Sequence, residues 1–144
     1  MSERIEFVDD VTSDLAFVAR GETPEAAFTA AADALLAATV VNPEAVEARL
    51  EWHLELVEPD LELLLLAFLN ELVFLRDARG WLLRVAEAHI ASQNGEASLR
   101  ARMVGEPLDA ARHRRAAEVK AATAHGLRVA PARDGWEIGV TLDV

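Results

Sequence analysis

The stretch DLELLLLAFLNELVFLRDARG, residues 60–80, predicts the central helix of the protein. Asp60 can cap the first turn of this helix, and residues 76–80, Arg-Asp-Ala-Arg-Gly, end it. Asn70 and Glu71 interrupt the apolar surface, most simply as an exposed edge. The apolar side chains recur at helical spacing and cover a wide face: Leu61, Leu64, Leu65, Phe68, Leu72 and Leu75, with Leu63, Leu66 and Leu69 beside them.

Apolar and polar residues alternate on both sides of this helix, which predicts half-buried strands. A second helix begins at Thr23-Pro24, where the threonine can accept a first-turn N–H and the proline lacks only a donor that would stay unsatisfied. The predicted elements are a strand pair over 6–19 joined by an acidic turn, a helix over 23–39, a strand over 46–56, the helix over 60–80, strands over 81–91 and 97–105 joined at Gln93-Asn94-Gly95, and strands over 118–129 and 136–144 joined at 131–135.

These elements predict an α+β fold with a single domain over residues 1–144. A mostly antiparallel sheet of about six or seven strands would pack with the two main helices. The chain has 144 residues, of which 52% are hydrophobic, and this is enough for one such core. No internal repeat or linker divides the sequence.

The charge of the chain restricts its partners. Twenty-five acidic and fourteen basic side chains give a formal net charge of −11 at pH 7, which repels phosphate backbones and anionic membranes. We therefore expect no strong direct binding to nucleic acid and no membrane partner. No apolar run approaches the roughly 20 residues of a membrane helix, so a cytoplasmic location is the default expectation. Because cysteine is absent, a metal would depend on oxygen or imidazole ligands.

Asp143 is the first candidate metal ligand. In the final strand it lies opposite the apolar face, so it points away from the core, and Val144 adds a backbone carbonyl and a terminal carboxylate. If the acidic turn with Asp9, Asp10 and Asp14 lies beside this terminus, the carboxylates repel one another unless a cation neutralises them. Calcium suits such oxygen ligands. The alternative is an ordinary turn and a solvated strand end.

Lys120 is the only lysine in the sequence. A lone lysine can mark a place where a compact ammonium is preferred to a guanidinium, and the alternative is an ordinary exposed side chain. Alternation places Thr123 and His125 on the other face of this strand, where we expect them to face the core and support the strand. Gly126 can mark a bulge.

Residues 112–115, Arg-His-Arg-Arg, form the one dense basic cluster of this acidic sequence. Arg112 and His113 are therefore candidates for docking an acidic partner surface or a phosphate. A solvated loop is the alternative.

The sequence resembles the archease family over nearly its whole length. Residues 118–127, EVKAATAHGL, are similar to that family's E-V-K-A-x-T-x-H-G-L strand, and residues 135–144, GWEIGVTLDV, to its G-W…x-D-V ending. Residues 105–113, GEPLDAARH, resemble its G-E-P-x-D…R-H turn, and residues 60–77 its leucine-rich helix with Asn-Glu-Leu. The family's D-H-T-A-D motif appears as residues 10–14, DVTSD, with Val11 in place of the histidine.

The resemblance implies a function that residue chemistry alone does not give. Archeases are non-enzymatic activators of the RtcB-type RNA ligase, which joins a 3′-phosphate end to a 5′-hydroxyl end with GTP and manganese in tRNA splicing or RNA repair. They are expected to promote ligase guanylylation and turnover. Pattern and resemblance together give the candidate site: a divalent metal, calcium by expectation, on Asp14, Asp143 and Val144; partner-facing Asp10, Lys120, Arg112 and His113; supporting Thr123 and His125.

Two other functions are compatible with the residues. A small metal-dependent phosphoesterase would use Asp14, Asp143, Lys120 and His125, and it would turn over substrate without a ligase. A chaperone-like module for RNA-processing proteins would need no metal and would bind RNA with a steep salt dependence. The negative charge argues against the second of these.

Overall fold

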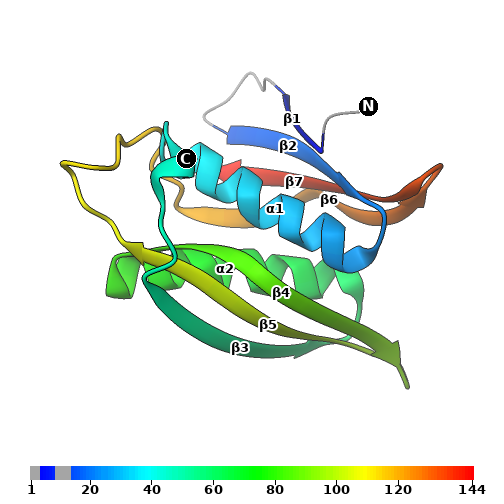
Figure 1. Cartoon of the computed structure of the whole chain (residues 1–144). Helices are drawn as coiled ribbons and strands as arrows, with labels where there is room; N and C mark the ends of the chain where they lie inside the picture. The colour runs from blue at the N-terminus through cyan, green and yellow to red at the C-terminus, as the bar shows by residue number, and fades with distance from the viewer. Residues whose placement is uncertain (1–3, 9–13) are drawn as a thin grey trace.

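Helix α1 (Pro24–Thr39) lies between two antiparallel sheets, with α2 (Leu61–Arg79) beside it in the same layer (Figure 1). The computed structural model describes residues 4–8 and 14–144. One sheet has the strand order β1-β2-β7-β6, and the other has the order β3-β5-β4. The strands are β1 (Ile5–Val8), β2 (Asp14–Gly21), β3 (Leu50–Glu58), β4 (Trp81–Gln93), β5 (Glu96–Pro107), β6 (Ala121–Ala132) and β7 (Gly135–Asp143).

Alanine fills most positions of α1 that face the sheets. A methyl group is all that separates the helix backbone from its neighbours there, so both sheets can approach closely. Beyond its first two residues, Pro24 and Glu25, only a narrow stripe of the helix is partly exposed: Ala26, Thr29, Asp33 and Ala37. The predicted start is confirmed, because the Thr23 hydroxyl accepts the Ala26 N–H at 3.1 Å. The buried alanines are Ala27, Ala30, Ala31, Ala32, Ala34 and Ala38.

Helix α2 forms the other half of the central layer, as the sequence predicts. The Asp60 carboxylate accepts the Leu63 N–H at 2.8 Å, and Gly80 ends the helix with a φ of 74°. Just beyond the last turn, Trp52 and Trp81 meet edge to face at 5.1 Å, and the Arg79 guanidinium lies 5.3 Å from each ring. These contacts fix the end of α2 against β3 and β4.

The predicted α+β class, with antiparallel strands and two main helices, is confirmed, and the strands are divided between two sheets. The predicted boundaries differ most in three places, and one of them is the start of β6, which is Ala121 instead of Glu118. Strand β3 begins at Leu50, because a short 3-10 turn over Pro43–Ala45 precedes it, although Val46 is buried as expected. The turn between β6 and β7 is shorter than predicted, because Pro131 pairs with Trp136. β6 is an edge strand, where a proline is tolerated.

The apolar side chains of both sheets converge on the helical layer. β2 and β7 contribute Phe17, Ala19, Ile138, Val140 and Leu142, each at most 2% exposed. Among the described residues, neither helix is long and apolar enough to cross a membrane.

Replacing Ala31 with leucine tests the tight fit of α1. Ala31 is fully buried, so three added carbons must displace a sheet, and we expect Ala31→Leu to lower the free energy of unfolding by about 1–3 kcal/mol. Chemical denaturation measures this loss. Ala37→Leu on the exposed stripe is the matched control, with an expected change within about 0.5 kcal/mol. Equal effects of the two variants would contradict the proposed fit.

Candidate functional site

Asp14 and Asp143 form a directly opposed pair at one end of the β1-β2-β7-β6 sheet. In the antiparallel pairing of β2 and β7, Asp14 lies across from Asp143, and the next residues, Leu15 and Leu142, pair on the core side. Directly opposed residues have Cβ atoms about 4.5–5.5 Å apart and share a face. Both carboxylates therefore lie on the face that points away from the helices. We call Asp14 and Asp143 the acidic pair.

The surroundings of the acidic pair are described in part. Asp9 and Asp10 of the predicted acidic turn, and Val11, lie outside the described residues. Val144 follows Asp143 and is partly buried against the core. Within residues 4–8 and 14–144, no three histidine, cysteine, aspartate or glutamate side chains gather where they could hold a metal ion. The described part of the chain thus offers two carboxylates and main-chain oxygens at this end of the sheet.

The backbone of Lys120 is joined to the acidic pair. Its N–H donates to the carbonyl oxygen of Asp143 at 2.7 Å, and the next residue, Ala121, pairs with Asp143 in the β6–β7 register. The Lys120 side chain is exposed, as the sequence predicts. The start of β2, the end of β7 and the start of β6 lie at the same end of their sheet (Figure 1). This end carries Asp14, Asp143 and Lys120, the residue just before β6.

A bulge interrupts β6 three residues after Lys120. Thr123 pairs with Thr141 and Arg128 pairs with Gly139, so the four residues 124–127 lie opposite one residue of β7. Gly126 has a φ of 67°, which favours glycine, and a Cβ added to Gly139 would lie 3.5 Å from the Gly126 oxygen. The bulge marked by Gly126 in the sequence is therefore present, and it lies over the outer face of β7.

The expectation that Thr123 and His125 face the core is wrong. Their face was inferred from alternation with Val119, which is buried before β6 begins at Ala121, whereas within the strand Ala122 takes the core position. His125 is exposed and lies in the bulge. Thr123 shares the outer face with Thr141, since the core position is taken by Ala122. The Thr123 hydroxyl donates to the Thr141 carbonyl at 3.1 Å and accepts the His125 N–H at 3.4 Å. Thr123 therefore stabilises the base of the bulge.

Arg112 and His113 do not form the accessible basic surface that the sequence suggests. His113 is 1% exposed, and its Nε2 lies 3.1 Å from the carboxylate of Glu106, which is 2% exposed. Its Nδ1 accepts the Asp109 N–H at 2.9 Å, so Nε2 carries the hydrogen and donates. Arg112 donates to the other Glu106 oxygen and, at 2.8 Å, to the Ala45 carbonyl. These contacts explain why the two residues face inward.

The Glu106 carboxylate holds this cluster together. Burial alone would raise its pKa, but hydrogen bonds from the Glu47 N–H, Arg112 and His113 outweigh burial and lower the pKa to about 2. The hydrogen bond between Arg112 and Glu106 also raises the pKa of Arg112. The cluster ties the loop before β3 to the loop after β5, so its role is structural.

Comparison with known proteins identifies the family. A sequence model of the Archease protein family matches residues 6–144. The chain belongs to the archease family. Protein archease of Pyrococcus furiosus is 34% identical over 134 residues, covering 92% of this chain and 94% of the relative. Protein archease of Methanosarcina mazei is 34% identical over 136 residues, covering 92% and 91%.

The fold agrees with that of a solved structure. The solution structure of protein 1598 of Methanobacterium thermoautotrophicum superposes with a TM-score of 0.84 at 30% identity, covering 98% of this chain and 99% of that one. Within this archease fold the family-like motifs have separate places. Residues 118–127 form the segment that leads into β6, the start of β6 and its bulge, whereas residues 105–113 contain most of the Glu106 cluster.

Sequence reasoning missed the polar residues of α2 that contact the site. Asn70 is not the exposed edge of the helix, because its side-chain amide binds the backbone of Ala122 in β6. Arg76 donates to the carbonyl of Val119. The one signal in the sequence was the presence of polar side chains within a strongly apolar helix.

Substitution of Glu106 tests the buried cluster through its pH dependence. The pKa of Glu106 is lowered on folding, so its stabilising contribution is present above its ordinary pKa of 4.5 and is lost as the pH falls towards about 2. We expect Glu106→Gln to be clearly less stable than the wild type near neutral pH, and the difference to shrink between these values. Urea denaturation across this range measures it. Glu44→Gln, at an exposed position, should show no such trend, and a difference independent of pH would refute the assignment.

Proposed function

We propose that this protein activates an RtcB-type RNA ligase, which joins RNA 3′-phosphate and 5′-hydroxyl ends with GTP, and that the acidic pair is the part that acts on the ligase. Membership of the archease family supports the class of partner. The opposition of Asp14 and Asp143 at one end of the sheet supports the site, because two regions of the chain that are far apart in sequence bring two half-buried carboxylates together.

The acidic pair suits a hard divalent cation such as calcium. Carboxylates placed directly across a strand pair repel one another, and a shared cation removes this cost. Calcium accepts carboxylates, main-chain carbonyls and water in flexible geometry. Asp14 and Asp143 would hold the ion, with the Val144 carbonyl as a further oxygen donor. When bound, the ion supplies positive charge that keeps the two carboxylates together at the tip.

Charge complementarity explains why such a tip would enter a ligase site. An enzyme that binds GTP and RNA ends must attract phosphate, so its active site carries positive charge. An acidic protein with two carboxylates at one end is attracted to such a site and approaches in a defined orientation. Lys120, whose backbone N–H binds the Asp143 carbonyl and whose side chain is exposed, adds a cationic group that can contact a phosphate or carboxylate. The protein then organises the ligase and catalyses no reaction of its own.

Loss of either carboxylate should abolish activation. In an assay of ligase guanylylation with limiting ligase, we expect Asp14→Asn and Asp143→Asn to reduce stimulation about tenfold or more, because each removes one of the two carboxylates that would hold the ion. Asp134→Asn is the matched control, since Asp134 is exposed in the turn at the other end of β7. Normal stimulation by folded variants of the acidic pair would exclude the proposal. Phosphoester turnover by the pure protein without ligase would favour an enzyme instead.

Calcium should stabilise the wild type through the same pair. A ligand that binds only the folded state raises the melting temperature, so added calcium should raise it in the wild type and not in Asp143→Asn. With a chelator present, Asp143→Asn should melt at a higher temperature than the wild type, because the variant removes a like-charge contact worth about 0.2–1 kcal/mol. Differential scanning calorimetry measures both. An equal calcium response in the two proteins would show that the ion binds elsewhere.

A further inference from the structure

Helix α2 supplies hydrogen-bond partners to the outer edge of β6. β6 lies at the edge of its sheet, so one row of its backbone N–H and C=O groups has no strand beside it. Three side chains of α2 bind groups along this edge: Arg76 at Val119, Asn70 at Ala122 and Glu62 at Val129. The helix thus holds the edge strand at Ala122 and Val129 and the segment that leads into it at Val119.

Asn70 makes the most complete of these contacts. Its amide nitrogen donates to the Ala122 carbonyl at 3.0 Å, and its amide oxygen accepts the Ala122 N–H at 2.9 Å. The side chain therefore pairs with one β6 residue as a neighbouring strand would. An asparagine can do this because its amide carries both a donor and an acceptor.

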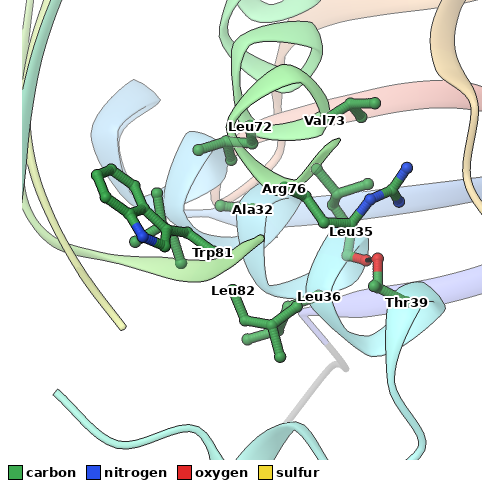
Figure 2. Close-up of a pocket in the computed structure, with 10 residues that line it drawn as sticks. Ala32, Leu35, Leu36, Thr39, Leu72, Val73, Arg76, Trp81 and Leu82 are labelled. Carbon is green, nitrogen blue, oxygen red and sulfur yellow. Dashed lines mark hydrogen bonds between the residues drawn. The ribbon is translucent and has the colours of Figure 1, made fainter. Parts of the chain in front are cut away.

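Arg76 anchors the residue before Lys120. Its Nη2 donates to the Val119 carbonyl, and its Nε and Nη2 also bind the Asp77 carboxylate at 3.0 and 2.8 Å. The side chain is only 9% exposed. Figure 2 shows its stem lining a small pocket with Leu35 and Thr39 of α1 and Val73 of α2. The pocket has room for about one water molecule, so the stem of Arg76 has little freedom to move.

These two contacts lie on either side of Lys120. Val119 precedes it, Ala122 follows two residues later, and the N–H of Lys120 itself binds Asp143. We infer that Asn70 and Arg76 are positioning residues that fix Lys120 beside the acidic pair. The inference rests on the proposed function for its biological meaning, because it assigns to α2 the task of holding the ammonium group where the ligase meets the tip.

Glu62 offers a matched control within the same helix. Its carboxylate accepts the Val129 N–H at 3.1 Å, so it also holds the edge of β6. Val129 lies beyond the bulge, which separates it from Lys120. Loss of either contact removes support from the same edge strand, but only the Asn70 contact adjoins the tip.

Amide hydrogen exchange tests the positioning directly and without the ligase. In Asn70→Ala we expect exchange at Lys120 and Ala122 to accelerate about tenfold or more, because the Ala122 N–H loses its acceptor and the segment loosens. Exchange at Val129 should stay as in the wild type. Glu62→Ala should show the reverse pattern. Unchanged exchange at Lys120 in Asn70→Ala would overturn the inference, whatever the ligase assay shows.

Ligase activation then separates positioning from general destabilisation. At a temperature where all variants are folded, Asn70→Ala should lower stimulation of guanylylation about as much as Lys120→Ala, and Glu62→Ala should leave it unchanged. The double variant of Asn70 and Lys120 should be no worse than Lys120→Ala alone, because both changes remove the same interaction. Additive losses, or full activity of Lys120→Ala, would overturn the inference. Absence of stimulation by the wild type would instead reject the proposed function and leave the exchange result as the test of positioning.

Discussion

Close contact between α1 and two sheets is the constraint on which the rest of the structure depends. The helix can be buried from both sides because most of its inward positions are alanine, and larger side chains at those positions would force the layers apart. β2 packs directly on this helix and pairs with β7, which in turn pairs with β6. The packing of α1 against β2 therefore helps to determine where the ends of β2, β7 and β6 lie.

The site is a consequence of strand direction. In an antiparallel sheet, the start of β2, the end of β7 and the start of β6 must lie at the same end, and this is where Asp14, Asp143 and Lys120 are placed. Two different supports keep this end in register. The sheet fixes the two carboxylates through main-chain pairing, whereas α2 fixes the segment around Lys120 through side chains. The arrangement of the tip therefore depends both on the pairing of β2 with β7 and on side chains of α2, which are far apart in the sequence.

Features set by local periodicity could be predicted from the sequence, and features set by tertiary contacts could not. The helix caps at Thr23 and Asp60 and the outward direction of Asp143 follow from local rules. The exposure of His125 does not, because its direction was inferred from alternation with Val119, which is buried before β6 begins, whereas Ala122 takes the core position within the strand.

Two further features required knowledge of residues far along the chain. Arg112 and His113 look like a basic surface in the sequence, and only the fold places the Glu106 carboxylate between them. Asn70 shows the same limitation, since its partner is 52 residues away. The bulge has an evolutionary consequence in this setting. Because residues 124–127 lie outside the regular pairing of β6 with β7, a change of length within the bulge need not move Lys120, which the contacts at Val119 and Ala122 hold separately.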